Sequence, residues 1–218
     1  MTVDIRSVEY AGTVATPDGA LPGDLPQVAF SGRSNVGKSS LINTLLRRTR
    51  RHVARVSGTP GKTQALNFYR VNDAFFLVDL PGFGYARVPA SVRDSWRRLV
   101  EGYLGRREGI RGVVHLIDAR RGPMDTDLKM MSYLGELGLP VLVVLTKVDK
   151  LKRQERGRVV ERTMRALEID TEQILPFSSQ TGEGRDALLG ALDSLLDDGE
   201  RPLPGEESLE PTNAGGEP

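Results

Sequence analysis

The chain has 218 residues, of which 39% are hydrophobic and 27% charged, which is typical of one globular domain with tails. It contains no cysteine, which excludes disulfides, thiolate metal sites and a cysteine nucleophile, so we expect a reducing, cytoplasmic location. No apolar run approaches the ~20 residues that span a bilayer, and residues 1–10 do not resemble a secretory signal. We therefore expect no membrane association.

The formal net charge of +1 conceals two oppositely charged parts of the chain. Residues 1–165 contain 28 Lys and Arg against 16 Asp and Glu, a net charge of +12. Residues 166–218 contain 2 against 13, a net charge of −11. No acidic residue occurs from Leu25 to Asn72. This asymmetry indicates a basic body that can meet nucleic-acid phosphates and an acidic end.

The first half of the chain predicts three strands and a helix after an irregular start. Residues 1–24 are rich in Pro and Gly and predict an irregular lead-in with one short strand at its start. Apolar patterns then predict a strand, an amphipathic helix, a long basic loop and two strands joined by a turn at Asn72-Asp73. In chain order these segments are residues 27–31, 38–48, 49–63, 65–71 and 74–80.

The second half alternates helices with strands. Apolar periodicity predicts helices around residues 92–103, 125–137, 152–167 and 188–196, and strands at 113–117, 141–145 and 174–177. This alternation predicts an α/β fold with a doubly wound, mostly parallel sheet over residues 25–198. Residues 199–218 are rich in Pro, Gly and Glu, so we expect a disordered acidic tail.

The segment after the strand at 27–31 matches G-x-x-x-x-G-K-[ST], the phosphate-loop motif of P-loop proteins. It consists of Gly32, Arg33, Ser34, Asn35, Val36, Gly37, Lys38 and Ser39, with Ser40 next in the helix. The glycines let the backbone wrap closely, so that its N–H groups and the helix N-terminus face phosphate oxygens. Lys38 brings a positive charge to the terminal phosphates, and the Ser39 hydroxyl can bind Mg²⁺. The motif predicts a nucleoside triphosphate site.

Two further segments predict that the base is guanine rather than adenine. The residues Thr146, Lys147, Val148 and Asp149 follow the strand at 141–145. The Asp149 carboxylate can accept two N–H donors that guanine offers and adenine does not, while the Lys147 stem covers the ring. After the last strand, a backbone N–H can reach the guanine oxygen from the group Ser178, Ser179 and Gln180.

A third segment predicts a metal and γ-phosphate contact at the end of the strand at 74–80. It consists of Asp79, Leu80, Pro81 and Gly82, where Asp79 can hold Mg²⁺ through a water and the Gly82 N–H can meet the γ-phosphate. In the loop before it, which includes Gly61 and Lys62, Thr63 is the favoured second hydroxyl ligand, although Thr49 and Thr59 are alternatives.

The residue after Gly82 is Phe83, where Ras-like GTPases have a glutamine that orients water. A phenylalanine cannot hydrogen-bond water. We therefore expect slow intrinsic hydrolysis, or a contribution from elsewhere.

Over about residues 25–197, the sequence resembles the EngB GTPases. The resemblance is carried by residues 32–43, then by Pro60 to Gln64, and most specifically by the extension Gly82-Phe83-Gly84-Tyr85-Ala86. It implies a GTPase that acts in assembly of the large ribosomal subunit and is required for normal cell division and septation. It also implies Ser39 and Thr63 as Mg²⁺ ligands, and Lys147, Asp149, Ser178 and Ser179 around the guanine.

Related GTPases that lack the glutamine use an asparagine of the phosphate loop to hold K⁺. By resemblance Asn35 has this role here, with a plain loop asparagine as the alternative. The expected function is thus GTP hydrolysis as a switch, with Lys38, Asn35 and Gly82 as catalytic residues. The expected partners are rRNA phosphates and proteins of the large-subunit precursor, and we expect a monomer. The alternative is a nucleotide-gated interaction protein in cell division with incidental hydrolysis.

Overall fold

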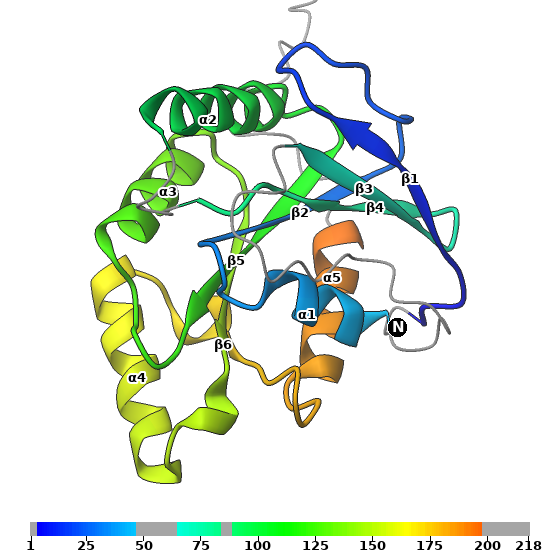
Figure 1. Ribbon diagram of the computed structural model, residues 1–218. Helices are drawn as coiled ribbons and strands as arrows, with labels where there is room; N and C mark the ends of the chain where they lie inside the picture. Colours follow the sequence, from blue (N-terminus) through cyan, green and yellow to red (C-terminus); the bar gives the residue numbers. More distant parts are fainter. Residues whose placement is uncertain (1–3, 47–64, 84–88, 198–218) are drawn as a thin grey trace, which may run out of the picture.

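In the computed structural model, which describes residues 4–46, 65–83 and 89–197, five α-helices cover both faces of one seven-stranded sheet (Figure 1). The strands are β1 (Val8–Val14), β2 (Gln27–Gly32), β3 (Leu66–Val71), β4 (Phe75–Asp79), β5 (Ile110–Asp118), β6 (Val141–Thr146) and β7 (Ile174–Pro176). The helices are α1 (Lys38–Leu45), α2 (Ala90–Gly105), α3 (Asp125–Glu136), α4 (Arg153–Leu167) and α5 (Arg185–Asp197), with short 3-10 turns at Val148–Lys150 and Thr171–Gln173. The predicted α/β class is confirmed.

The strand order places five carboxyl ends along one edge of the sheet. The order is β1-β3-β4-β2-β5-β6-β7. Strand β2 runs parallel to β4 and β5, and β5, β6 and β7 are parallel in turn. Open sheets of this kind bind ligands outside the carboxyl ends of their strands. The loops that follow β2, β4, β5, β6 and β7 therefore meet at the edge where a ligand is expected.

The central strands are apolar on both faces because helices cover both faces. Val28 and Phe30 of β2 pack in one core with side chains of α1 and α5, whereas Ala29 between them packs with α2 and α3. Figure 1 shows these two helix pairs on opposite sides of the sheet. The alternation follows the two-residue period of a strand. Full burial of Phe30 contributes about 2–3 kcal/mol.

The predicted turn at Asn72-Asp73 joins β3 and β4 as an antiparallel hairpin. Val71 pairs with Phe75, and Asn72 and Asp73 both have positive φ, at 52° and 54°. Tight hairpins favour this conformation because it matches the right-handed twist of the strands, and Asn and Asp tolerate it. The hairpin carries Asp79 at its far end, so the turn helps to set the position of that carboxylate.

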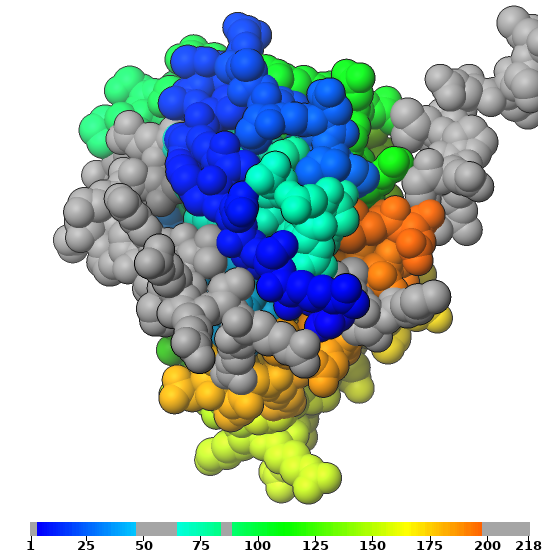
Figure 2. Space-filling model, turned by 90° about the vertical axis from the view of Figure 1, so that its right-hand side faces the viewer, coloured from blue at the N-terminus to red at the C-terminus, as the bar shows by residue number. Residues whose placement is uncertain are grey.

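The N-terminal segment contributes an edge strand to the sheet. Strand β1 pairs antiparallel with β3, with an irregularity between Tyr10 and Gly12, and Glu9 forms an ion pair with Arg70 at 2.6 Å. Figure 2 shows this dark blue segment on the surface beside the cyan β3–β4 hairpin. The short strand predicted at the start of the lead-in over residues 1–24 is therefore present as Val8–Val14. Its long-range antiparallel pairing has no signal in the local Pro- and Gly-rich pattern.

Some predicted features lie outside the described residues. They are the basic loop at 49–63 with Gly61, Lys62 and Thr63, and the tail at 199–218.

Candidate nucleotide-binding site

The loop between β2 and α1 has a backbone that only particular residues allow. Gly32 has a φ of 155°, and a Cβ there would lie 2.9 Å from the carbonyl oxygen of Leu116. Asn35 and Gly37 also have positive φ, at 64° and 108°. Gly37 precedes α1, which has no side-chain cap and no acidic residue in its first turn. The free N–H groups of that turn thus form a ready anion site, as the motif predicts.

The structure brings Lys38 of the loop together with Asp79 of β4. Lys38 Nζ forms an ion pair with Asp79 Oδ1, and their side chains are only 10% and 6% exposed. The pairing follows from the sheet, because Asp79 lies beside Phe30 in the parallel β2–β4 register. Ser39 follows Lys38 in the first turn of α1. A buried carboxylate and a hydroxyl are hard oxygen donors and fit Mg²⁺.

The segment after β4 lies against the phosphate loop. Ser34 donates its backbone N–H to the carbonyl of Phe83 at 2.9 Å, and its hydroxyl to the carbonyl of Gly82 at 3.2 Å. Leu80, which is buried, donates its N–H to the Phe30 carbonyl at 3.0 Å, and Pro81 is buried too. This predicted segment therefore does reach the phosphate loop. Within the described residues, no cluster of three or more His, Cys, Asp or Glu side chains forms a metal site.

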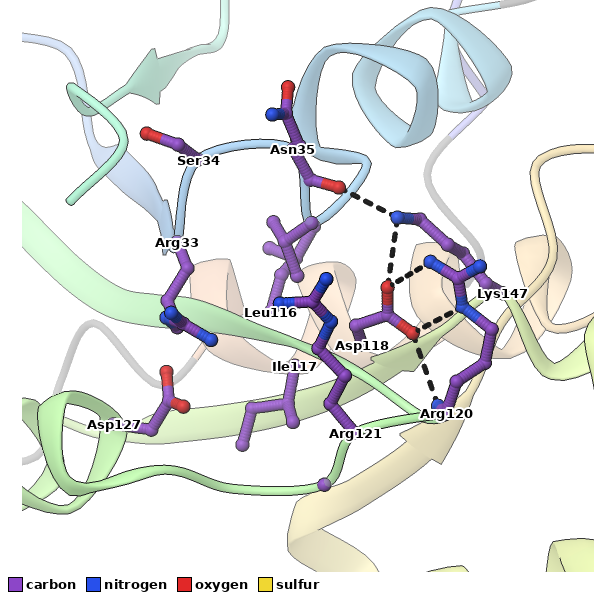
Figure 3. A pocket seen from close by; sticks show the side chains of 12 residues that line it. Arg33, Ser34, Asn35, Leu116, Ile117, Asp118, Arg120, Arg121, Asp127 and Lys147 are labelled. Carbon is purple, nitrogen blue, oxygen red and sulfur yellow. Dashed lines mark hydrogen bonds and ion pairs between the residues drawn. The ribbon is translucent and has the colours of Figure 1, made fainter. Parts of the chain in front are cut away.

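The loop after β6 is bonded directly to the phosphate loop. Thr146 donates its hydroxyl to the carbonyl of Val36 at 2.7 Å, and Lys147 donates its Nζ to the carbonyl of Asn35 at 2.6 Å. Lys147 itself has a left-handed backbone, with φ at 62°. Figure 3 shows its ammonium between the Asn35 carbonyl and a carboxylate from β5, Asp118. The two segments predicted to bind phosphate and base are thus joined.

Asp149 lies in contact with the segment after β7. Ser178 donates its hydroxyl to Asp149 Oδ1 at 2.7 Å, and Lys150 Nζ lies 3.3 Å from Asp149 Oδ2. The Ser178 hydrogen bond and the Lys150 charge hold the pKa of Asp149 below its ordinary value. The Ser178 oxygen in turn accepts the backbone N–H groups of Gln180 and Thr181, each at 3.2 Å. The carboxylate is therefore ionised and held in one orientation.

The remaining residues of these segments have supporting positions. Val148 is buried and donates its N–H to the carbonyl of Phe177 at 3.3 Å. The carbonyls of Ser40 and Ser179 accept the Thr44 hydroxyl, at 2.8 and 3.5 Å. These contacts tie α1 to the segment after β7.

Sequence reasoning missed Asp118, which ends β5 at the same edge of the sheet. Asp118 Oδ2 accepts Lys147 Nζ at 2.9 Å, and Arg120 binds both carboxylate oxygens at 2.7 and 2.9 Å. Burial alone would raise the pKa of Asp118, but these hydrogen bonds outweigh it and lower the pKa to about 2. A cavity of about 310 Å³ is lined by this cluster and by Arg33 and Ser34 of the phosphate loop (Figure 3). An acid directly after an apolar strand was the available signal.

We expect the Asp118→Asn substitution to reduce stability in a pH-dependent way. The folded-state pKa of about 2 lies below the ordinary value of about 3.9. Ionised Asp118 therefore stabilises the fold fully above about pH 4, and this contribution is lost as pH falls through about 2. Urea unfolding of both proteins between about pH 7 and pH 2 measures it. A difference in unfolding free energy that persists unchanged at about pH 2 would contradict the assignment.

The fold and the site define a class before any comparison with known proteins. A parallel sheet with a Gly-rich Lys-Ser loop between β2 and α1, and an Asp79 carboxylate beside it, defines a P-loop nucleotide-binding protein. Family models agree: one described as "50S ribosome-binding GTPase" matches residues 27–147, and one described as "Elongation factor Tu GTP binding domain" matches residues 107–198. The chain is therefore a P-loop GTPase.

Full-length relatives identify the family. The "Probable GTP-binding protein EngB" of Gemmatimonas aurantiaca is 49% identical over 193 residues, which cover 88% of this chain and 94% of that protein. Its namesake in Syntrophotalea carbinolica is 48% identical over 196 residues, covering 90% and 94%. The chain belongs to the EngB family of GTP-binding proteins, and the predicted family resemblance is confirmed.

Solved structures support the same fold. The crystal structure of a probable GTP-binding protein engB superposes with a TM-score of 0.67 at 24% identity, covering 79% of this chain and 99% of that one. Era in complex with MgGDPNP and nucleotides 1506–1542 of 16S ribosomal RNA superposes with a TM-score of 0.64 at 24% identity, covering 84% and 60%. Among the described residues, no helix is both long and apolar enough to cross a membrane.

Proposed function

We propose that the chain is a GTP-hydrolysing switch that acts in assembly of the large ribosomal subunit. The observation that carries the proposal is the meeting of three segments at one sheet edge: the phosphate loop, the segment after Asp79, and the Asp149–Ser178 pair. Membership of a GTPase family supports the assignment of GTP hydrolysis. The matched family is described as ribosome-binding, which supports the large subunit as the partner.

In this proposal the phosphate side of the site acts on the terminal phosphates. Lys38 contacts the β- and γ-phosphates, and the Gly82 N–H contacts the γ-phosphate from the segment that lies on the loop. Ser39 and Thr63 would hold Mg²⁺ through their hydroxyls and Asp79 would hold it through a water, with Thr63 outside the residues that the structure describes. When bound, Mg²⁺ offsets the negative charge of the phosphates.

The base side of the site selects guanine. Asp149 accepts the two N–H donors of the base edge, and the Lys147 stem covers the ring while its ammonium stays on Asn35 and Asp118. The support is that the Asp149 carboxylate is already oriented by Ser178. The backbone of residues 178–180 is the proposed donor to the guanine oxygen.

We further propose that K⁺ binds at Asn35 and offsets charge in the transition state, where no glutamine follows Gly82. The Asn35 side chain is exposed, and Figure 3 shows its amide directed away from Lys147 and Asp118. We expect hydrolysis to be at least about fivefold faster in K⁺ than in Na⁺, and the Asn35→Ala variant to lose the difference. Phosphate release in matched chloride salts measures this. Equal rates of the unchanged chain in both salts would reject the role.

The proposed partner is the precursor of the large ribosomal subunit, met through rRNA phosphates and ribosomal proteins in the cytoplasm, with the chain as a monomer. The excess of basic residues over residues 1–165 supports contact with RNA phosphates. The structural neighbour Era, of which the matched part is 60%, was crystallised in complex with nucleotides of 16S ribosomal RNA. A role in cell division and septation would follow from ribosome supply.

Sucrose-gradient sedimentation tests this function. Cell extracts carrying the tagged chain are run with GTP, GDP or a non-hydrolysable GTP analogue. We expect the chain to move with large-subunit particles in the analogue and to leave them in GDP. Absence from these particles in every nucleotide would favour the alternative, a nucleotide-gated interaction protein in cell division.

A further inference from the structure

A fully buried histidine lies next to the proposed γ-phosphate contact. His115 of β5 is 0% exposed and lies opposite Ser31 in the β2–β5 register. Ser31 is the residue before the phosphate loop. Its Nδ1 is 3.0 Å from the Ser31 hydroxyl, and its Nε2 is 3.3 Å from Asp127 Oδ1. The tautomer in which Nε2–H donates to Asp127 and Nδ1 accepts from Ser31 satisfies both contacts.

Asp127 fixes the other end of this network. It lies in the first turn of α3 and is 1% exposed, and its second oxygen accepts the backbone N–H of Met124 at 2.9 Å. The imidazole is thus held between the end of β2 and the start of α3. The side chains of Ser31, His115 and Asp127 are each at most 1% exposed. This buried series is a support and not a catalytic triad.

The ring of His115 supports Phe83. The two rings stack with centroids 5.9 Å apart and planes 12° apart, within the range of favourable offset stacking. On another side, Phe83 borders an apolar cavity of about 330 Å³ between α2 and α3, lined also by Leu80, Trp96 and Met130. The cavity does not fix the ring on that side, whereas the imidazole is itself fixed by hydrogen bonds.

Phe83 also carries the backbone that meets the phosphate loop. Its carbonyl accepts the Ser34 N–H at 2.9 Å, its own N–H donates to the Gly32 carbonyl at 3.4 Å, and Gly82 precedes it. A ring held on His115 therefore holds the Gly82 peptide in one place over the loop. The Phe83 side chain is directed toward β5 by the same stack.

We propose that His115 is a positioning residue of the γ-phosphate switch, which acts by stacking on Phe83 and so fixing the Gly82 N–H over the phosphate loop. The inference rests on the proposed γ-phosphate role of Gly82. It assigns a function to a buried side chain that is 33 residues away from Gly82 in the sequence.

The test compares the affinity of a non-hydrolysable GTP analogue with that of GDP, because GDP has no γ-phosphate for Gly82 to contact. His115→Gln keeps hydrogen-bonding capacity but removes the imidazole ring. Phe83→Leu removes the other ring of the stack, at a residue that is only partly buried. We expect each to weaken analogue binding about five- to tenfold and GDP binding less than about twofold. We also expect the KM of GTP to rise in step with the loss of analogue affinity.

The double variant sharpens the test. If the stack is the shared element, His115→Gln with Phe83→Leu weakens analogue binding about as much as either single change, not by the product of both. His115→Phe restores a ring without the hydrogen bonds to Ser31 and Asp127, so a folded variant is expected to recover only part of the loss. Tyr103→Phe is the matched control, because it removes a buried hydrogen bond to Gln27 at the opposite end of β2. It should leave the ratio of analogue affinity to GDP affinity unchanged.

Two outcomes separate this inference from the role of Gly82. Gly82→Ala keeps the backbone N–H, but its Cβ would lie 3.2 Å from Ser34 Cα and so displace the peptide, and we therefore expect it to reduce analogue binding relative to GDP. If Gly82→Ala leaves the ratio unchanged, the proposed role of Gly82 fails. If it changes the ratio but folded His115→Gln and Phe83→Leu do not, or if their effects multiply in the double variant, the positioning role of His115 is overturned.

Discussion

Replacement of Lys38 by alanine is expected to abolish GTP hydrolysis and to weaken GTP binding at least about 100-fold. The Lys38 ammonium is only 10% exposed and lies at the end of α1 where free N–H groups gather. A charge-assisted hydrogen bond contributes about 1.5–3 kcal/mol, and Lys38 is proposed to make two, to the β- and γ-phosphates. A loss of ~2.7 kcal/mol already corresponds to 100-fold in affinity.

Titration with a fluorescent GTP analogue measures this effect. The change also leaves the Asp79 carboxylate without its Lys38 partner, so thermal unfolding must first show that the variant is folded. Lys129→Ala, which removes an exposed lysine of α3, is the matched control and should bind GTP normally. A folded Lys38→Ala protein that binds GTP within about threefold of the unchanged chain would refute the assignment of the phosphate site.

The Asp149→Asn substitution is expected to change the preferred base from guanine to xanthine. Xanthine carries an oxygen where guanine has its amino group, and an asparagine amide can donate to that oxygen where a carboxylate cannot. Because hydrogen bonds to a charged acceptor are about twice as strong as neutral ones, we expect GTP affinity to fall about 100-fold and xanthosine triphosphate affinity to rise.

Competition between the two nucleotides for the bound fluorescent analogue measures this preference. Since Ser178 and Lys150 lower the pKa of Asp149, the carboxylate stays ionised to lower pH than an ordinary aspartate, and the unchanged chain should retain its preference for GTP at neutral and mildly acidic pH. Ser178→Ala should weaken GTP binding without a change of base, because it removes only the support of the carboxylate. Retained GTP preference in Asp149→Asn would exclude the residue as the base contact.

The parts of the site that the sequence predicted are those whose residues lie close together in the chain. The phosphate loop, Asp79–Gly82 and Thr146–Asp149 each follow a recognisable apolar strand, and parallel strands bring their ends to one edge. The Ser178–Asp149 contact could have been predicted for the same reason, since the two residues follow neighbouring strands.

The features that the sequence did not predict depend on strand register and on pairing between distant segments. Ser31 and His115 are opposite each other only because β2 and β5 pair in one register across 84 residues. The strand at Val8–Val14 pairs with β3 through a segment whose local composition favours irregular structure. Neither relation follows from local periodicity, so the contact between Ser31 and His115 was not predicted and the N-terminal strand was placed outside the domain.

The hydrogen bonds that join Thr146 and Lys147 to the phosphate loop have a consequence for the length of the ligand. They set the spacing between the place of the base and the place of the phosphates within the protein, independently of what is bound. A nucleotide with a shortened or extended link between base and phosphates can satisfy only one end at a time. If the proposed site is correct, the protein selects ligands by the distance between base and phosphates, and the hydrogen bonds to the backbone carbonyls of Val36 and Asn35 fix that distance.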